Sequence, residues 1–278
     1  MNFDPTPAQH EILEQIRVVL ADEVAPYAES WDRESRFPEA VVKALGKVGA
    51  SGVYIPQEFG GRGLDTVAYT LVIEEISSVL PALGITHSVN NSLFANPIRR
   101  FGNPDQQKTY LEPVASGRAI GAFVLTEPEA GSDATRLKTV AVRDDDGYVL
   151  NGEKSMVISG GPADFFLVIA ATEPEKTSRG LTAFLIPADT PGVSRGPRDE
   201  TMGLRSADVR PLTFENVKLT DANRLGEENH GFGILTESIN AGRIGVGAQA
   251  VGIARGAYER ALNYSRHRKQ FGRYLWEI

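Results

Sequence analysis

The segment from Leu125 to Asp133, LTEPEAGSD, carries the residue types best suited to chemistry in this sequence. A proline, a glycine and small or acidic residues interrupt any periodic pattern, so the segment is predicted to be a loop. Thr126, Gly131 and Ser132 offer two hydroxyls and unhindered backbone N–H groups, which suit a phosphate or the polar edge of a heterocycle. An ordinary β-turn explains the same residues equally well, and the pattern alone leaves both interpretations open.

A second candidate is the basic sequence RHRKQFG, from Arg266 to Gly272. Its cations could complement the dipole at the C-terminus of a long helix. They could also aim a guanidinium at a phosphate, with Phe271 packed beside a planar group. Taken alone, the pattern favours the first interpretation.

Other chemical patterns are weak. A G-x-G-x-x-A sequence at Gly245, Gly247 and Ala250 lies inside a helical stretch and does not follow a strand, so it predicts helix packing rather than dinucleotide binding. The sequence has no cysteine, and its histidines show no ligand spacing, so no metal site is predicted. The histidines are His10, His87, His230 and His267.

The elements that position these residues begin with helices. Thr6 and Pro7 form an N-cap and a first-turn proline, and Asn103 with Pro104 repeats the signal. Apolar periodicity predicts helices over residues 7–24, 38–48, 66–79, 85–101 and 104–117.

After Gly117 the apolar stretches become short and rich in β-branched residues. Strands are predicted at residues 138–143, 148–151, 166–171, 181–186 and 212–217. Crossover helices are absent, which argues against a parallel dinucleotide-binding sheet. The pattern predicts a β-barrel or a β-sandwich.

From Gly231 to His267 the pattern is helical again. Small residues at spacings of three and four form a stripe that another helix can approach closely; they are Gly245, Ala248, Gly252 and Gly256. The final residues, from Tyr274 to Ile278, resemble the start of another element. The chain is therefore expected to stop within a domain and to leave the stripe exposed.

The predicted fold class is a multidomain α+β protein. It has an N-terminal all-α domain (1–117), a central β-barrel or sandwich domain (118–225) and the start of a C-terminal helical bundle (226–278). A net charge of −7 gives no basic footprint for nucleic acid, and the longest apolar run, Phe165 to Ala171, is too short to span a membrane. The N-terminus has no secretory pattern, so a soluble cytoplasmic protein is expected.

In combination, seven segments resemble the acyl-CoA dehydrogenase family of flavoproteins and keep that family's order. The TEP-AGSD and QFG elements are the most specific. The segments are YIPQEFGGRGLD (54–65), LTEPEAGSD (125–133), LNGEKSMVISGG (150–161), MGLRSADVRPLTFENVKL (202–219), LGEENHGFGIL (225–235), NAGRIGVGAQAVGIA (240–254) and RKQFG (268–272).

The resemblance implies FAD as cofactor. Phe123, Leu125 and Thr126 are expected to line the flavin ring, with Thr126 bonding the pyrimidine edge. Gly131 and Ser132 are expected to meet the FAD pyrophosphate or the pantetheine arm of the substrate.

The same resemblance assigns residues near the C-terminus. Arg268, Gln270 and Phe271 match residues that reach FAD in a neighbouring subunit, which implies a homo-oligomer, a dimer or a tetramer. Asn240 and Arg243 match positions that contact the CoA portion of the substrate.

Beside flavin N5 the family usually has an aromatic residue and then a hydroxyl residue. An ungapped match places Met156 and Ile158 there, whereas a shift of one residue supplies Ser159. Ser159 is the predicted N5 partner.

The family's chemistry needs a carboxylate that removes the α-proton of an acyl thioester while a β-hydride moves to flavin N5. In most members this is a glutamate in the last helical domain, and in a minority it immediately precedes the arginine matched by Arg243. Here that position is Gly242. The base is therefore expected beyond Ile278 and its identity is unknown.

The implied function is that of an FAD-dependent acyl-CoA dehydrogenase of fatty acid metabolism, a CH–CH oxidoreductase. It would form the 2,3-enoyl-CoA and pass electrons to an electron-transfer flavoprotein. The alternatives are a truncated, non-catalytic flavin- or acyl-CoA-binding paralogue, a subunit of a heteromeric complex, and a related flavin oxidase.

Overall fold

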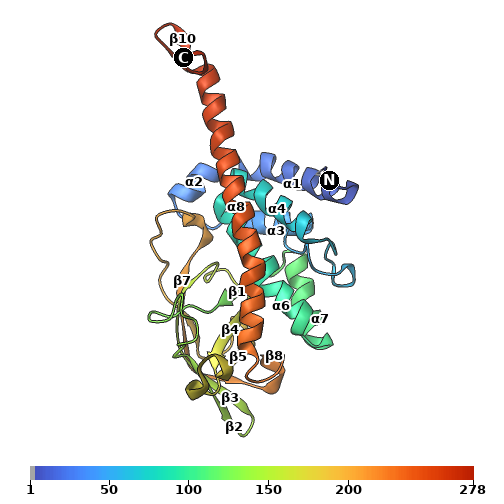
Figure 1. Cartoon of the computed structure of the whole chain (residues 1–278), viewed down its shortest axis with the longest axis vertical. Helices are drawn as coiled ribbons and strands as arrows, with labels where there is room; N and C mark the ends of the chain where they lie inside the picture. The colour runs from blue at the N-terminus through green and yellow to red at the C-terminus, as the bar shows by residue number, and fades with distance from the viewer. Residues whose placement is uncertain (1–3) are drawn as a thin grey trace.

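The computed structural model describes residues 4–278 and begins with a helical part (Figure 1). Residues 1–3, with which the first predicted domain starts, lie outside the described residues. The helices are α1 (Pro7–Val19), α2 (Ala28–Arg33), α3 (Glu39–Lys47), α4 (Thr66–Val79), α5 (Pro81–Ser88), α6 (Asn96–Phe101) and α7 (Pro104–Ala115). Two π-helical segments, η1 (Leu20–Val24) and η3 (Val89–Ala95), extend α1 and join α5 to α6, and a 3₁₀ turn covers Gln57–Phe59.

Local signals explain most of these helix ends. The Thr6 side chain accepts a hydrogen bond from the Gln9 N–H, and the Gln9 side chain accepts one from the Thr6 N–H. Asn103 and Gln106 form the same capping box at α7. The predicted helices are confirmed, although the fourth begins earlier, at Pro81. Helix α2 was not predicted, because six residues are too few to show a period.

The middle of the chain forms one sheet. Its strands are β1 (Gly121–Val124), β2 (Val140–Asp144), β3 (Gly147–Val157), β4 (Phe165–Ala171), β5 (Leu181–Pro187), β6 (Val193–Arg195), β7 (Arg210–Leu219) and β8 (Arg224–Leu225). The order is β6-β7-β3-β2-β4-β5-β8, with β1 paired parallel to β4. All five predicted strands are confirmed. Among the described strands the path is open between β6 and β8, so the sheet does not close into a barrel.

Strand β4 lies at the centre of the hydrophobic core. Phe166, Val168 and Ala170 belong to one buried cluster, which also contains apolar residues from most of the N-terminal helices. Leu167 and Ile169 belong to a second cluster on the opposite face, with residues of α6 and α7. Because both faces of β4 are buried, its sequence is an unbroken apolar run rather than an alternating one.

Helix α8 (Gly231–His267) is 37 residues long and has the predicted bounds. It crosses the molecule and projects beyond it, ending in a hairpin of β9 (Lys269–Gln270) and β10 (Arg273–Tyr274) and a 3₁₀ turn at Leu275–Glu277 (Figure 1). The predicted C-terminal bundle is represented by this single helix in the described residues. No helix within residues 4–278 is both long and apolar enough to cross a membrane.

The small-residue stripe of α8 packs on α4. A Cβ added at Gly252 would lie 2.3 Å from the Glu74 carbonyl oxygen, and one at Gly256 would lie 2.0 Å from that of Ser78. The predicted close helix approach is therefore confirmed. The expectation that the stripe is exposed is wrong, because α4 of the N-terminal part occupies that face.

Candidate functional site

The loop from Leu125 to Asp133 follows β1 directly. A tight turn occupies its middle, where the Glu127 N–H donates to the Ala130 carbonyl at 3.0 Å and the Ala130 N–H donates back at 3.1 Å. Gly131 and Ser132 follow on the surface, and nothing lies within 4 Å of a Cβ added at Gly131. The loop thus contains a turn and also presents free backbone to solvent.

A hollow of about 210 Å³ lies at the start of this loop. Strand β1 and the loop contribute Phe123, Leu125 and Thr126, so the structure brings these three predicted residues together. The other lining residues come from η3, from β3 and the residue that follows it, and from α8; they are Val89, Leu93, Ser155, Met156, Ile158 and Ile239.

The C-terminal end of β3 forms the opposite wall of the hollow. The Ser155 N–H donates to the Thr126 carbonyl at 2.8 Å and joins the two walls. The register of β3 against β7 shifts between Lys154 and Val157, and Met156 has a left-handed backbone (φ 58°). This bulge interrupts the alternation of the strand, so neighbouring side chains line the same hollow.

Ser159 is not among the residues that line the hollow, and its role beside flavin N5 stays a prediction. Its side chain is buried, its Oγ is 3.3 Å from the Thr86 Oγ1, and its N–H donates to the Ala207 carbonyl. Ile158, the residue of the ungapped match, lines the hollow instead. The ungapped match therefore names two residues that line the hollow, Met156 and Ile158, whereas the shift of one residue names a buried side chain beside Thr86.

A fully buried ion pair supports the loop from below. The Lys154 Nζ donates to the Glu127 Oε1 at 2.9 Å, and the two side chains are 0% and 4% exposed. Burial lowers the pKa of Lys154 to about 8, and the Glu127 charge opposes that shift. Burial raises the pKa of Glu127, but the Lys154 charge and hydrogen bonds outweigh it and hold that pKa below its ordinary value. The pair is therefore ionised at pH 7.

This pair was not predicted from the sequence. A signal was present, because Lys154 is in phase with Tyr148 and Leu150 on the inward face of β3. A lysine at an inward strand position needs a buried acceptor, and Glu127 supplies it. Residues Val89, Leu93 and Ile239 carried no comparable signal.

Helix α8 places Asn240 and Arg243 on the surface next to the hollow. Both side chains are exposed, and the Arg243 Nη1 donates to the Asn240 Oδ1 at 2.8 Å. Gly242 lies between them on the buried face, where an added Cβ would be 2.9 Å from the Leu93 Cδ2. Leu93 lines the hollow, so Gly242 lies just behind its wall.

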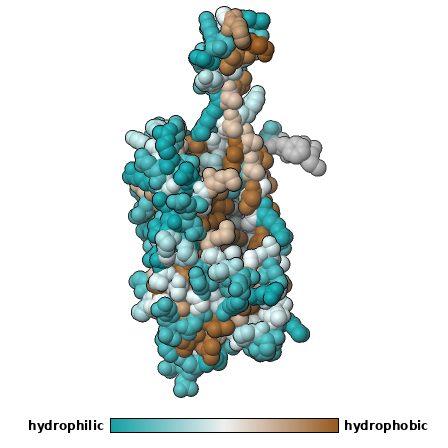
Figure 2. Space-filling view, turned by 90° about the vertical axis from the view of Figure 1, so that its left-hand side faces the viewer, coloured by the Kyte–Doolittle hydropathy of each residue, from teal (hydrophilic) through white to brown (hydrophobic). Residues whose placement is uncertain are grey.

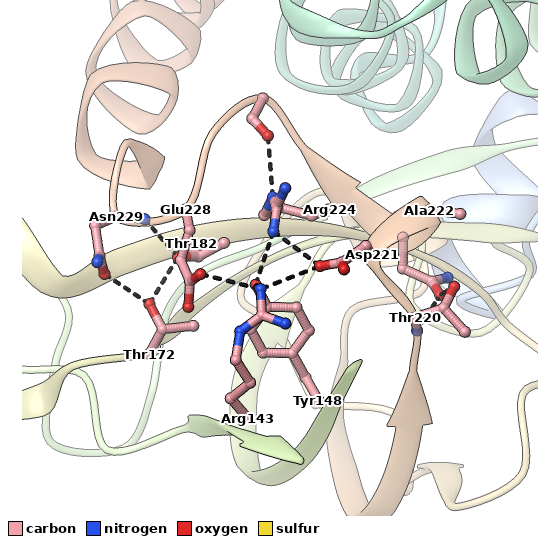
Figure 3. Close-up of polar contacts among 12 residues, drawn as sticks. Arg143, Tyr148, Thr172, Thr182, Thr220, Asp221, Ala222, Arg224, Glu228 and Asn229 are labelled. Carbon is pink, nitrogen blue, oxygen red and sulfur yellow. Dashed lines mark hydrogen bonds and ion pairs between the residues drawn. The ribbon is translucent and has the colours of Figure 1, made fainter. Parts of the chain in front are cut away.

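The segment that enters α8 is fixed to the sheet (Figure 3). The Asn229 N–H donates to the Thr182 Oγ1 at 2.9 Å, and the Thr172 Oγ1 donates to the Asn229 Oδ1 at 2.8 Å. Asn229 has a left-handed backbone (φ 66°), which asparagine tolerates better than most residues. These bonds fix the direction in which α8 leaves the sheet.

Two arginines strengthen this anchor (Figure 3). The Arg143 Nη2 and the Arg224 Nη1 each donate to the Tyr148 Oη at 2.9 Å, and both pair with Asp221. Arg143 also pairs with Glu228. The opposite charges balance one another, so the cluster joins parts of the chain and offers no charged ligand site.

The predicted residues of the C-terminal hairpin lie far from the hollow of the same chain. Arg268, Gln270 and Phe271 are at the projecting end of α8 (Figure 1). Phe271 is at the hairpin turn with φ 53° and is 94% exposed. The structure therefore brings only part of the predicted site together within one molecule.

Helix α8 also exposes apolar side chains. They are Phe232, Ile244, Val246, Val251, Ile253, Tyr258 and Tyr264. On one face of the molecule, apolar residues gather along the middle and continue towards the projecting end, with hydrophilic residues on either side (Figure 2). Exposed apolar surface of this kind is typical of a face that another protein surface covers.

The residues at the hollow fit a flavin. Aliphatic and aromatic walls suit a flat apolar ring system, and Thr126 and Ser155 supply hydroxyls and backbone groups for a polar edge. Gly131 and Ser132 lie further along the same loop, where the chain is open to a larger ligand. Within residues 4–278 there is no cluster of three or more His, Asp or Glu side chains that could hold a metal ion.

Comparison with known families gives three matches in chain order. The models of the acyl-CoA dehydrogenase N-terminal, middle and C-terminal domains match residues 6–118, 122–217 and 229–277. An acyl-CoA dehydrogenase of Bacillus subtilis (strain 168) is 41% identical over 268 residues, 96% of this chain and 71% of that protein. A short-chain specific acyl-CoA dehydrogenase of Clostridium acetobutylicum is 39% identical over 275 residues, 99% of this chain and 73% of that protein.

Solved structures share the fold. A chain in the structure of the electron transferring flavoprotein of Acidaminococcus fermentans matches with a TM-score of 0.97 at 39% identity, over 100% of this chain and 73% of that chain. Butyryl-CoA dehydrogenase from Megasphaera elsdenii matches with a TM-score of 0.96 at 38% identity, over 100% and 74%. PigA with FAD and proline matches with a TM-score of 0.92 at 26% identity, over 100% and 73%.

Proposed function

This chain belongs to the acyl-CoA dehydrogenase family, and we propose on that premise that it is an FAD-dependent oxidoreductase acting on acyl-CoA thioesters. The reaction is α,β-dehydrogenation to the 2,3-enoyl-CoA. The single observation that carries the proposal is the hollow at the start of the Leu125–Asp133 loop, whose lining matches a flavin ring.

The residues of the hollow hold and orient the cofactor and the acyl chain. Phe123 and Leu125 would pack against the ring, and Thr126 would bond its pyrimidine edge. Gly131 and Ser132 would meet the pyrophosphate or the pantetheine arm through open backbone and a hydroxyl. A bound flavin supplies a two-electron acceptor for the β-hydrogen of the substrate.

Asn240 and Arg243 bind the CoA portion. Both are exposed on α8 beside the hollow, and Arg243 can pair with a phosphate at this surface. The names of the relatives favour a short acyl chain, because they are called short-chain specific and butyryl-CoA dehydrogenases. The electron acceptor is an electron-transfer flavoprotein, as the structure from Acidaminococcus fermentans suggests.

The protein acts as a homo-oligomer. Arg268, Gln270 and Phe271 project from the end of α8, so they can reach a flavin only in a second copy of the chain. The exposed apolar side chains of α8 support the same arrangement. The domain bounds 1–117, 118–225 and 226–278 are part of this proposal. We also propose a cytoplasmic location, because CoA thioesters are intracellular metabolites.

A second candidate is a flavin- and acyl-CoA-binding protein without turnover. Within the part of the chain that the structure describes, the residues lining the hollow include no carboxylic acid, and Gly242 offers none. Proton removal from the substrate needs a base within hydrogen-bond reach. The base of the first candidate therefore lies outside this lining.

The purified protein tests both candidates. We expect bound FAD with visible absorbance, and bleaching of that absorbance when butyryl-CoA is added without oxygen. Longer acyl-CoA substrates should bleach it more slowly if a short chain is preferred. A protein that binds no FAD would refute the proposed function, and FAD that is never bleached would select the binding-only candidate.

A further inference from the structure

The buried pair of Lys154 and Glu127 lies directly beneath the loop that we assign to the flavin. Lys154 is on β3, and its ammonium group has three donors. They go to the Leu125 carbonyl at 2.8 Å, the Ile169 carbonyl at 2.7 Å and the Glu127 Oε1 at 2.9 Å. Two of the three acceptors belong to the loop itself.

Glu127 ties the same loop to the start of β2. Its Oε2 accepts the Lys138 N–H at 2.5 Å, and its Oε1 accepts the Thr139 N–H at 3.0 Å. Both side chains are buried, so water has little access to these bonds. The loop is thus held on two sides by one ion pair at residues that immediately flank Thr126.

We propose that Lys154 and Glu127 are positioning residues, which set the Leu125–Thr126 backbone against the edge of the flavin. The inference rests on the proposed function. Leu125 and Thr126 line the hollow, and Leu125 is held by Lys154 from the opposite side. An apolar pair of similar volume would fill the same space but would leave the Leu125 carbonyl free to turn.

The geometry explains why an ion pair occupies this place. After Val124 the loop has only isolated backbone hydrogen bonds, from Ser155 to Thr126 and between Glu127 and Ala130, so the Leu125 carbonyl needs a side-chain partner. Lys154 satisfies carbonyls on the loop and on β4, and Glu127 satisfies N–H groups before β2. Removing either residue leaves buried groups unpaired, and the loop at the flavin edge becomes free to move.

The test compares Lys154→Met with Lys138→Met. Lys138 is the matched control, because its side chain is exposed and pairs with Glu129 on the surface, while its N–H bond to Glu127 survives the change. FAD affinity of each apoprotein is measured by quenching of flavin fluorescence. The visible circular dichroism of the bound flavin reports the surroundings of its ring.

We expect Lys154→Met to bind FAD at least tenfold more weakly and to change the visible circular dichroism, with both unchanged in Lys138→Met. Glu127→Gln keeps the shape of the side chain and serves as the second variant if Lys154→Met does not fold. A folded variant of either kind with the wild-type affinity and the wild-type spectrum would overturn the inference. Wild-type protein that binds no FAD would instead refute the proposed function, so the two failures are distinct.

Discussion

Replacing Gly252 by alanine on α8 is expected to destabilise the protein, whereas the same change at Gly247 stabilises it. A Cβ at Gly252 would lie 2.3 Å from the Glu74 carbonyl oxygen and 2.9 Å from the Ser77 Cβ. Ordinary contact begins near 3.4 Å, so α4 and α8 must separate by about 1 Å. At Gly247 nothing lies within 4 Å of the added atom.

The magnitude follows from two opposing terms. Overpacking of this kind costs up to about 3 kcal/mol, and alanine is favoured over glycine inside a helix by about 1 kcal/mol. Gly252→Ala should therefore lose about 2 kcal/mol, and Gly247→Ala should gain about 1 kcal/mol. Because the helix term is common to both, the difference between the variants measures the clash alone.

Urea unfolding followed by far-ultraviolet circular dichroism measures both free energies of unfolding. In thermal unfolding, the change of about 2 kcal/mol corresponds to a Tm lower by roughly 4 °C, since 1 kcal/mol shifts a chain of this size by about 2 °C. If Gly252→Ala is as stable as Gly247→Ala, the two helices are not in the close contact that the structure shows, and the explanation of the stripe fails.

Two further predictions concern the stability of the fold. Burial lowers the pKa of His87 to about 4, and the unfolded imidazole protonates below about pH 6.5, so the protein should lose about 2 kcal/mol of stability between pH 7 and pH 5. His87→Gln should remove this loss. The prediction fails if the free energy of unfolding falls by the same amount between pH 7 and pH 5 in the wild type and in the variant. Asn229→Ala should lose about 1–2 kcal/mol, because alanine strains the left-handed backbone and loses the bond from Thr172. Asn229→Gly should lose less, and equal losses in the denaturation midpoints would show that backbone strain contributes nothing.

The parts of the fold that could be predicted are those that depend on nearby residues. The capping boxes at Thr6 and Asn103 involve residues three apart, so the sequence reveals them directly. Closure of the sheet is different, because it depends on whether two short end strands meet. Strand β6 has three residues and β8 has two, and neither carries a pattern that predicts a partner.

For the candidate site too, the predictable residues are those close together in the sequence. Phe123, Leu125 and Thr126 are close together in the sequence, and they line one hollow. Which residues after Lys154 turn towards the hollow depends on the bulge in β3, and a bulge depends on the pairing of β3 with β7; Met156 and Ile158 line the hollow, and Ser159 does not. Leu93 reaches the hollow from a helix about thirty residues before the motif, where no local pattern points to a ligand.

Helix α8 joins the packing of the helices to the geometry of the site. Its buried face runs without a break from the hollow to α4, through Ser238, Gly242, Gly245, Gln249, Gly252 and Gly256. A straight helix is stiff, so its contact with α4 at Gly252 and Gly256 fixes the rotation and the height of Ile239 and Gly242 at the hollow. Because no side chain lies between the two helices at Gly252 and Gly256, no change of side-chain rotamer there can shift α8 relative to α4. Gly252 and Gly256 therefore influence the site through the packing of α8 on α4, without lining the hollow themselves.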